Sequence, residues 1–197
     1  PAAFAQNAPK ARPEPGLKIA EGMVQTHSRP RICAEMKPTA AIIALALAVA
    51  APAVAQNASQ IEHVRAGANC PGCNLFQADL SGLELRGRNY ARARLRQADL
   101  SLAVIARANF AGGDLRDLNA FGAVLTGSNF AGANLTNASF VGAYLQGANF
   151  SGAHLEGVNF SGAEMDRAVG LTQRALSGAC GDPATTLPRG LHLRACA

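Results

Sequence analysis

The residues best suited to chemistry are four cysteines in the C-terminal part of the chain: Cys70, Cys73, Cys180 and Cys196. The first two form the stretch CPGC, whose Cys-x-x-Cys spacing is that of redox-active thiol pairs. Such a pair requires a strand–helix–strand setting, which the surrounding sequence does not indicate. The central Pro-Gly instead predicts a type II turn, which brings its first and last Cα atoms within about 7 Å and so within reach of a disulfide.

No other set of side chains indicates catalysis. The histidines His63, His154 and His192 lie far apart in the sequence, and none has a second residue at metal-ligand spacing. No phosphate-binding loop and no paired acidic site stands out. We therefore expect a protein that is not an enzyme, with no catalytic residue, no cofactor and no metal site.

The N-terminal segment is typical of an export signal. Lys37 precedes an unbroken apolar run over residues 40–51, and an Ala-x-Ala pattern at residues 53–55 precedes Gln56. The run is shorter than the roughly 20 residues of a membrane-spanning helix, which disfavours the alternative of a membrane anchor. We interpret residues 36–55 as a signal peptide and residues 1–35 as a disordered upstream or leader segment. The mature protein is then periplasmic or secreted, with no stable membrane insertion after cleavage.

A five-residue repeat dominates the rest of the chain. From Cys73 to Arg167 the central residue of every five is apolar, in nineteen consecutive windows. A helix would rotate successive apolar residues by roughly 140° and a strand would alternate them between two faces. A backbone that turns a corner after every five residues fits, because each side then points one central residue inward. Gly is the commonest residue two positions later, where the chain must bend tightly.

The stretches ADLSG, ANFAG, ANLTN and ANFSG resemble the pentapeptide-repeat family, whose repeat is A-[DN]-[LF]-x-x. The resemblance covers residues 73–167 and implies an all-β fold, a right-handed four-sided (quadrilateral) β-helix solenoid with four repeats to a coil. Coils stack about 4.8 Å apart, so nearly five coils make a rod roughly 24 Å long. Two inner columns would be uniform: Leu75, Leu95, Leu115, Leu135 and Leu155 in one, and Tyr90, Phe110, Phe130 and Phe150 in the other.

The ends of such a rod need caps, because they would otherwise expose core side chains and unpaired backbone. We expect an N-terminal cap over residues 56–72, which contains the CPGC turn, and a C-terminal cap over residues 168–197. The C-terminal cap would combine a short helix, with Thr172 as N-cap and Gly181 as its stop, with a loop. The two cysteine pairs would lie at opposite ends of the rod, too far apart for one zinc ion with Zn–S bonds of about 2.3 Å. We therefore predict structural disulfides Cys70–Cys73 and Cys180–Cys196.

Charge does not favour nucleic acid as a partner. The net charge of +5 is uneven, because residues 1–37 hold six basic and three acidic residues, and the remainder holds twelve arginines and ten acidic residues. The arginine-rich stretch LRGRNYARARLRQ would spread over three sides of the rod, as a solvated surface. Arg94 would pair with Asp114 one coil later. We expect no nucleic-acid binding.

One side of the rod is a candidate interaction face. The residue before each central residue points outward, and on this side the series is Glu84, Val104, Val124, Tyr144 and Glu164. Val104, Val124 and Tyr144 would lie in line on three consecutive coils, with acidic residues at both ends. The alternative is that β-branched and aromatic residues only pair well between neighbouring coils.

We therefore predict an exported, non-enzymatic scaffold. It would be a protein–protein or envelope interaction module, whose partner is an unknown protein or a second copy of the chain. The resemblance implies one alternative, because some pentapeptide-repeat proteins mimic DNA and bind gyrase. Such a mimic should be acidic and cytoplasmic. The stretch CPGC leaves a second alternative, a periplasmic thiol–disulfide protein.

Overall fold

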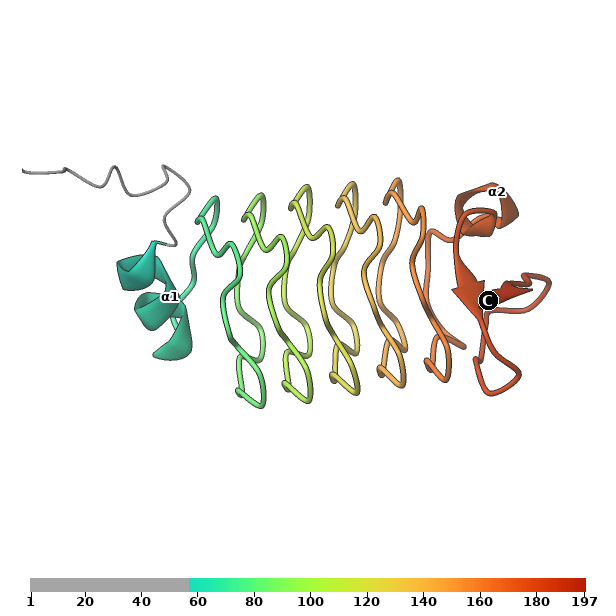
Figure 1. Ribbon diagram of the computed structural model, residues 1–197, viewed down its shortest axis with the longest axis horizontal. Coiled ribbons are helices and arrows are strands. Elements are labelled where there is room, and N and C mark those ends of the chain that lie inside the picture. The colour runs from blue at the N-terminus through green and yellow to red at the C-terminus, as the bar shows by residue number, and fades with distance from the viewer. Residues whose placement is uncertain (1–56) are drawn as a thin grey trace, which may run out of the picture. The chain divides into compact units, whose positions relative to one another are not determined.

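The computed structural model describes residues 57–197, so the predicted leader and signal segments (residues 1–35 and 36–55) lie outside the described residues. Between residues 70 and 169 the backbone turns after every five residues, and one residue of each five forms a parallel bridge 20 positions along the chain. Four five-residue sides therefore make one coil. Figure 1 shows the coils side by side between helix α1 (Ala58–Arg65) and the C-terminal elements.

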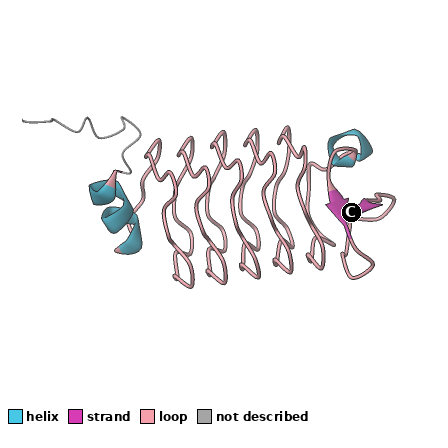
Figure 2. Cartoon of the chain, viewed as in Figure 1, coloured by secondary structure: helices cyan, strands magenta, loops and turns pink. Residues whose placement is uncertain are grey.

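Backbone hydrogen bonds join each coil to its neighbours on both sides. In the repeat centred on Leu95, the Leu95 amide donates to the carbonyl of Asp114 on the next coil at 2.8 Å. The Arg94 amide donates to the carbonyl of Cys73 on the previous coil at 2.8 Å, and the Ala98 amide closes the corner on the Leu95 carbonyl at 3.0 Å. Since each side contributes a single bridged residue, Figure 2 draws the coils as loops rather than as strands.

Where Asp or Asn precedes the central residue, its side chain accepts the amide of the first corner residue, which the backbone hydrogen bonds leave without an acceptor. Asn109 Oδ1 accepts from the Ala111 amide at 3.1 Å, and Asp99 Oδ1 accepts from the Ser101 amide at 2.8 Å. Side chains of Asp and Asn are suited to this because they accept a hydrogen bond from the backbone two residues later. The frequent Asp or Asn of the repeat therefore has a local backbone cause.

The second corner residue adopts the left-handed conformation, with φ of 64° at Gly132. No atom lies within 4 Å of a Cβ built at Gly132, so glycine is favoured there by backbone conformation and not by lack of space. Non-glycine residues take the same conformation at equivalent corners, among them Leu102 and Arg107 with φ of 58° and 59°.

The central residues form a continuous core. All nineteen central side chains from Leu75 to Met165 are at most 3% exposed. The aromatic column stacks as the spacing predicts, with ring centroids 5.3 Å apart between Phe110 and Phe130 and 5.2 Å apart between Phe130 and Phe150. Ala120, which is small for a central position, lies in the repeat where Leu118 replaces the usual small residue, and both side chains are fully buried.

The first coil begins one repeat earlier than the sequence boundary at Cys73. Cys70 occupies a central position, is 6% exposed, and donates its amide to the carbonyl of Asn89 at 2.9 Å, as other central residues do. The stretch ANCPG (residues 68–72) is therefore a repeat in which cysteine replaces the aromatic residue of its column. Arg88, which holds a normally small inward position, is exposed to solvent in the same coil.

Helix α1 covers the N-terminal end of the coils. Asn57 caps it by accepting the Gln60 amide, and its apolar face buries Ile61 and Val64. The N-terminal cap was predicted without this helix, although the Asn57 cap and the three-residue spacing of Ile61 and Val64 are signals for it. Gln60 Oε1 accepts the amide of Asn74 at 2.8 Å, a donor of the first coil.

Two short strands and a helix cover the C-terminal end. Helix α2 (Gln173–Leu176) has Thr172 as its N-cap, and strands β1 (Cys180–Gly181) and β2 (Arg194–Ala195) pair in parallel. The predicted helix stop at Gly181 is wrong, because α2 ends at Leu176. Leu176 is buried in the core. The residues after it leave the helix and extend over the last coil, where Cys180 bridges to Asn159.

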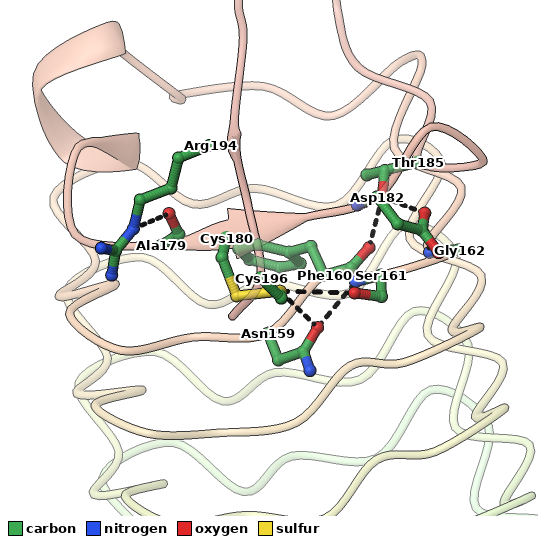
Figure 3. The surroundings of a disulfide bond; sticks show 10 residues. All are labelled: Asn159, Phe160, Ser161, Gly162, Ala179, Cys180, Asp182, Thr185, Arg194 and Cys196. Carbon is green, nitrogen blue, oxygen red and sulfur yellow. Dashed lines mark hydrogen bonds between the residues drawn. A yellow bond between two sulfur atoms is a disulfide. The ribbon is translucent and has the colours of Figure 1, made fainter.

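The paired strands continue one side of the coils. Asn159 of the last coil bridges to Cys180 of β1, and the Phe160 amide donates to the Cys180 carbonyl at 2.8 Å. Figure 3 shows the Cys180–Cys196 disulfide lying over this side, beside Asn159 and Ser161. Within residues 57–197, no helix is long and apolar enough to cross a membrane.

Candidate protein-interaction surface

Val104, Val124 and Tyr144 lie on the same side of three successive coils. Parallel bridges join Val104 to Val124 and Val124 to Tyr144, and continue to Glu84 at one end and Glu164 at the other. The two valines are half-buried and Tyr144 is 43% exposed, so these side chains face solvent and not the core. We call Val104, Val124 and Tyr144 the apolar strip.

The corner before this side carries three more apolar residues, which the sequence analysis missed. Leu102 and Phe121 are 63% and 52% exposed, and Val141 is half-buried. The Leu102 amide donates to the Phe121 carbonyl at 2.8 Å, so the two residues lie on adjacent coils at the same corner. We call Leu102, Phe121 and Val141 the apolar corner, and the corner and strip together the apolar patch.

A comparison of corners with each other would have found the apolar corner in the sequence. The first corner residue of this column is serine in three coils, Ser81, Ser101 and Ser161, and apolar in the two coils between the last two. The patch therefore combines apolar residues from three repeat positions: the residue before the central one, the first corner residue (Phe121 and Val141) and the second corner residue (Leu102).

Polar and charged residues border the apolar patch. The corner on its other flank carries Arg86 and Arg107, which line a hollow of about 490 Å³ together with Val124 and Thr126. Glu164 accepts a hydrogen bond from Gln146 at the C-terminal end. An apolar centre with a polar border is the usual arrangement of a protein–protein contact surface.

Charge is distributed unequally along the coils. Residues 70–109 contain six arginines and three acidic residues, a net charge of +3, and residues 110–169 contain two arginines and five acidic residues, a net charge of −3. The coils are therefore neutral as a whole and polarised from a basic N-terminal part to an acidic C-terminal part. The patch lies across the boundary between the two parts.

The arginine-rich stretch forms ion pairs that differ from the prediction. Arg94 and Asp114 are bridged neighbours, as expected, but the close partner of the Asp114 carboxylate is Arg116, with two contacts of 2.7 Å. The hydrogen bond from Arg116 lowers the pKa of Asp114. Arg94 adds only a weaker charge–charge attraction to the Asp114 carboxylate.

The cysteine pairs lie where they stabilise the ends of the coils. Cys70 and Cys73 are joined by a disulfide with Cα atoms 5.5 Å apart, and both residues are at most 9% exposed. Cys180 and Cys196 are joined with Cα atoms 4.9 Å apart. A reactive thiol requires an accessible, electropositive setting. Cys70 and Cys73 are buried in the CPGC turn and do not have that access.

The histidines are not brought together. His63 lies in α1, His154 on a side of the coils and His192 in the C-terminal loop, and all three are exposed. Among residues 57–197, no group of three or more His, Cys, Asp or Glu side chains could hold a metal ion.

The repeat matches a known family of sequences. The family model described as pentapeptide repeats matches residues 91–119, 114–152 and 138–169, with 8 copies. No curated protein matches the chain significantly.

Several solved structures are similar to the chain, all with TM-scores below 0.5. Rfr23 from the cyanobacterium Cyanothece 51142 is 23% identical, with a TM-score of 0.29, over 66% of this chain and 97% of its own. HetL from the cyanobacterium Nostoc sp. strain PCC 7120, involved in heterocyst differentiation regulation, is 24% identical, with a TM-score of 0.32, over 65% of each chain. QnrB1, a plasmid-mediated fluoroquinolone resistance protein, is 21% identical, with a TM-score of 0.28, over 62% of this chain and 78% of its own.

Proposed function

Residues 91–169 of this chain belong to the pentapeptide-repeat family, and we propose that the protein is an exported, non-enzymatic scaffold that binds a protein through the sides of its coils. Proteins of this family are generally structural or interaction scaffolds. Their fold is the right-handed quadrilateral β-helix. We propose the same handedness here, with a helix-containing cap at each end.

The apolar patch is the observation that carries this proposal. The core positions of the coils are filled by the chain's own side chains, at most 3% exposed, so Leu102 and Phe121 are not displaced core residues. Leu102 also occupies a left-handed corner with φ of 58°, a conformation that favours glycine. The fold does not require an exposed leucine at this corner, which is a glycine, Gly122, on the next coil, and a contiguous apolar surface of this kind is typical of a binding site.

Export is supported by the N-terminal sequence and by the cysteines. Lys37, the apolar run over residues 40–51 and the Ala-x-Ala pattern before Gln56 have the order of a signal peptide. Two disulfides between residues 57 and 197 suit an oxidising compartment, because cytosolic thiols are kept reduced. We therefore place the mature protein in the periplasm or outside the cell.

The two alternative functions have less support. A DNA mimic requires a strongly acidic surface, and residues 70–169 carry eight arginines and eight acidic residues. A thiol–disulfide protein requires an accessible thiol, and Cys70 and Cys73 are 6% and 9% exposed.

A capture experiment tests the proposed binding site. The full chain, tagged and expressed in its own cells, would be cross-linked and purified from the envelope fraction beside two variants. Val124→Asp places a charge in the centre of the patch, and Ser139→Asp places the same charge at the equivalent position of another side. Both variants should fold, because aspartate occupies equivalent positions at Asp79 and Asp99.

We expect wild type and Ser139→Asp to capture the same protein, and Val124→Asp to lose it. Equal capture by all three would show that the patch is not the binding site. Capture by none, in cells that produce the folded chain, would contradict the scaffold function itself.

A further inference from the structure

We propose that the apolar patch binds a second copy of this chain, in an antiparallel two-fold dimer centred on the third coil. The proposal rests on the proposed function, because it names the partner of the same surface. In this dimer the N-terminal coils of one copy lie against the C-terminal coils of the other.

The patch is centred on the coil that a two-fold axis requires. Its side residues follow the order Glu84, Val104, Val124, Tyr144 and Glu164 on five successive coils. A two-fold axis across this side at Val124 reverses the coil order, so Val124 meets its own copy and Val104 meets Tyr144. Phe121 lies three residues before Val124 and meets its own copy as well. An interface between identical chains requires this self-complementarity.

Charge selects the antiparallel orientation. On the corner that follows the strip, the reversed order places Arg86 of one copy opposite Asp166 of the other, beside the two glutamates that the same operation brings together, Glu84 and Glu164. A parallel pair, whose two-fold axis runs along the strip, would instead face Arg86 and Asp166 with the corner of Ser81 and Ser161, which offers neither of them an opposite charge. Complementary charge fixes orientation and disfavours the wrong arrangement of two partners.

The corner on the far flank of the strip carries the same complementarity at residue level. Its first positions on the five coils are, in order, Arg86, Ala106, Thr126, Gln146 and Asp166. The two-fold operation places Arg86 of one copy opposite Asp166 of the second copy, and does so at both ends. Thr126, the central member, faces itself and is uncharged. Around the strip, the N-terminal end carries Glu84, Arg86 and Arg107, and the C-terminal end carries Glu164, Asp166 and Arg167, so the two ends have opposite net charge.

Sedimentation of the purified full chain over a range of concentrations tests the dimer. We expect a reversible dimer for wild type and for Ser139→Asp. Val124→Asp should be monomeric at the same concentrations, because the two-fold axis brings two new carboxylates together. Circular dichroism and the urea midpoint should stay close to wild type in both variants. A monomeric wild type, or a dimer unaffected by Val124→Asp, would overturn the proposal.

Charge reversal tests the orientation. Arg86→Glu alone and Asp166→Arg alone should each weaken the dimer about tenfold or more, because each makes two like-charged contacts. The double variant, Arg86→Glu with Asp166→Arg, should restore the dimer. An equimolar mixture of the two single variants should form a mixed dimer, because both contacts between them pair opposite charges. If the mixture stays as weak as its components, the antiparallel arrangement is wrong.

The outcomes separate this inference from the proposed function. The chain could be a monomer and still capture another protein, with capture lost in Val124→Asp and kept in Ser139→Asp. That result would support the scaffold function and exclude a second copy as the partner. A dimer that forms in vitro, with no capture in cells of a tagged copy by an untagged one, contradicts self-association as the function of the patch.

Discussion

At the scale of single residues, the side chain before each buried residue has two roles. Asn109 accepts the amide of Ala111 at 3.1 Å, which closes its own corner. Its amide nitrogen also donates to Asn89 Oδ1 on the previous coil at 3.2 Å, which links neighbouring coils. An ionised aspartate has no donor for the previous coil, although it can accept from the next one, as Asp99 does from the amide nitrogen of Asn119 at 3.0 Å. Asparagine is therefore suited to positions where the same residue recurs on successive coils.

Tyr90 is the one aromatic side chain of the inner column with a polar atom. Its hydroxyl is buried and has no hydrogen-bond partner in the described structure, and burial raises the pKa of Tyr90 to about 12. We predict that Tyr90→Phe raises the free energy of unfolding at neutral pH by about 1 kcal/mol, because an unpaired buried hydroxyl is costly. Chemical denaturation would measure the change.

The same substitution should change the response to alkaline pH. The folded state favours the protonated phenol, so the free energy of unfolding does not depend on this ionisation below the ordinary pKa of 10.0 and falls as the pH rises from there toward 12. Tyr90→Phe should remove this loss. Tyr144→Phe is the matched control at concentrations where the chain is monomeric, because Tyr144 is then 43% exposed. An equal alkaline response in both variants would contradict the assignment to Tyr90.

The inward residues were predictable from sequence because a fixed period leaves little freedom. Every central side chain from Leu75 to Met165 is buried, and the volume exchange between Ala120 and Leu118 followed from the same alignment. The ion pair of Asp114 was not predictable, because stacking places Arg94 beside it and the chain places Arg116 two residues after it. Only the geometry of the corner decides which guanidinium forms the bidentate contact.

At the scale of elements, each cap replaces the hydrogen bonds of a missing coil. At the first coil, Gln60 and Asn69 accept the amides of Asn74 and Asn89, each at 2.8 Å. Arg65 of α1 donates to the carbonyl of Asp79 at 2.9 Å and 3.0 Å. The edges of the stack are therefore closed by side chains, which prevents them from pairing with other chains.

Asp182 has the corresponding role at the last coil. Its carboxylate accepts the amide of Gly162 at 2.8 Å, in the position where earlier corners bond to a following coil, and also binds Thr185 and Ala184. The hydrogen bond from the Gly162 backbone is the main cause that lowers the pKa of Asp182 below its usual 3.8. Its stabilising effect is therefore present above that value and is lost as the pH falls through the lowered pKa.

We predict that the urea midpoint of wild type falls between pH 5 and pH 2 more than that of Asp182→Asn. The amide oxygen of asparagine accepts the Gly162 hydrogen bond at every pH, so the variant has no carboxylate to protonate at this site. Glu62→Gln in α1 removes one exposed acid at the other end and serves as the control for net charge. If the urea midpoint of Asp182→Asn falls as much as that of wild type, Asp182 is not the source of the fall.

The caps were the least predictable elements. The prediction that Thr172 caps α2 is confirmed, because the Thr172 hydroxyl accepts the Ala175 amide at 3.1 Å, which is a purely local contact. The predicted end of α2 at Gly181 was wrong, because Cys180 and Gly181 form a strand, which bridges to Asn159 and pairs with β2. Helix α1 was missed because it has only eight residues, and most of its stability comes from packing against the first coil.

At the scale of the whole described structure, residues 57–197, each coil contacts only the coil before and the coil after it. The bridges join residues 20 apart along the stack, and strand β1 extends the same register at 21 residues from Asn159. Stability in such a stack is close to a sum of terms for single repeats and their nearest neighbours. Damage to one end should therefore spread inward coil by coil.

Loss of the C-terminal disulfide tests this local character. Cys180 and Cys196 are 16 residues apart, and a disulfide that closes such a loop is worth about 3 kcal/mol. In the double variant Cys180→Ser with Cys196→Ser, we expect the amides of Phe160 and Met165 to exchange with solvent faster, because they donate to the carbonyls of Cys180 and Thr186 in the cap. The amide of Tyr90, which donates to Asn109 near the other end, should keep its wild-type exchange rate. Hydrogen exchange measured by mass spectrometry or NMR gives these rates in one experiment. Equal acceleration at Phe160 and Tyr90 would mean that the coils unfold as a single cooperative unit and not one after another.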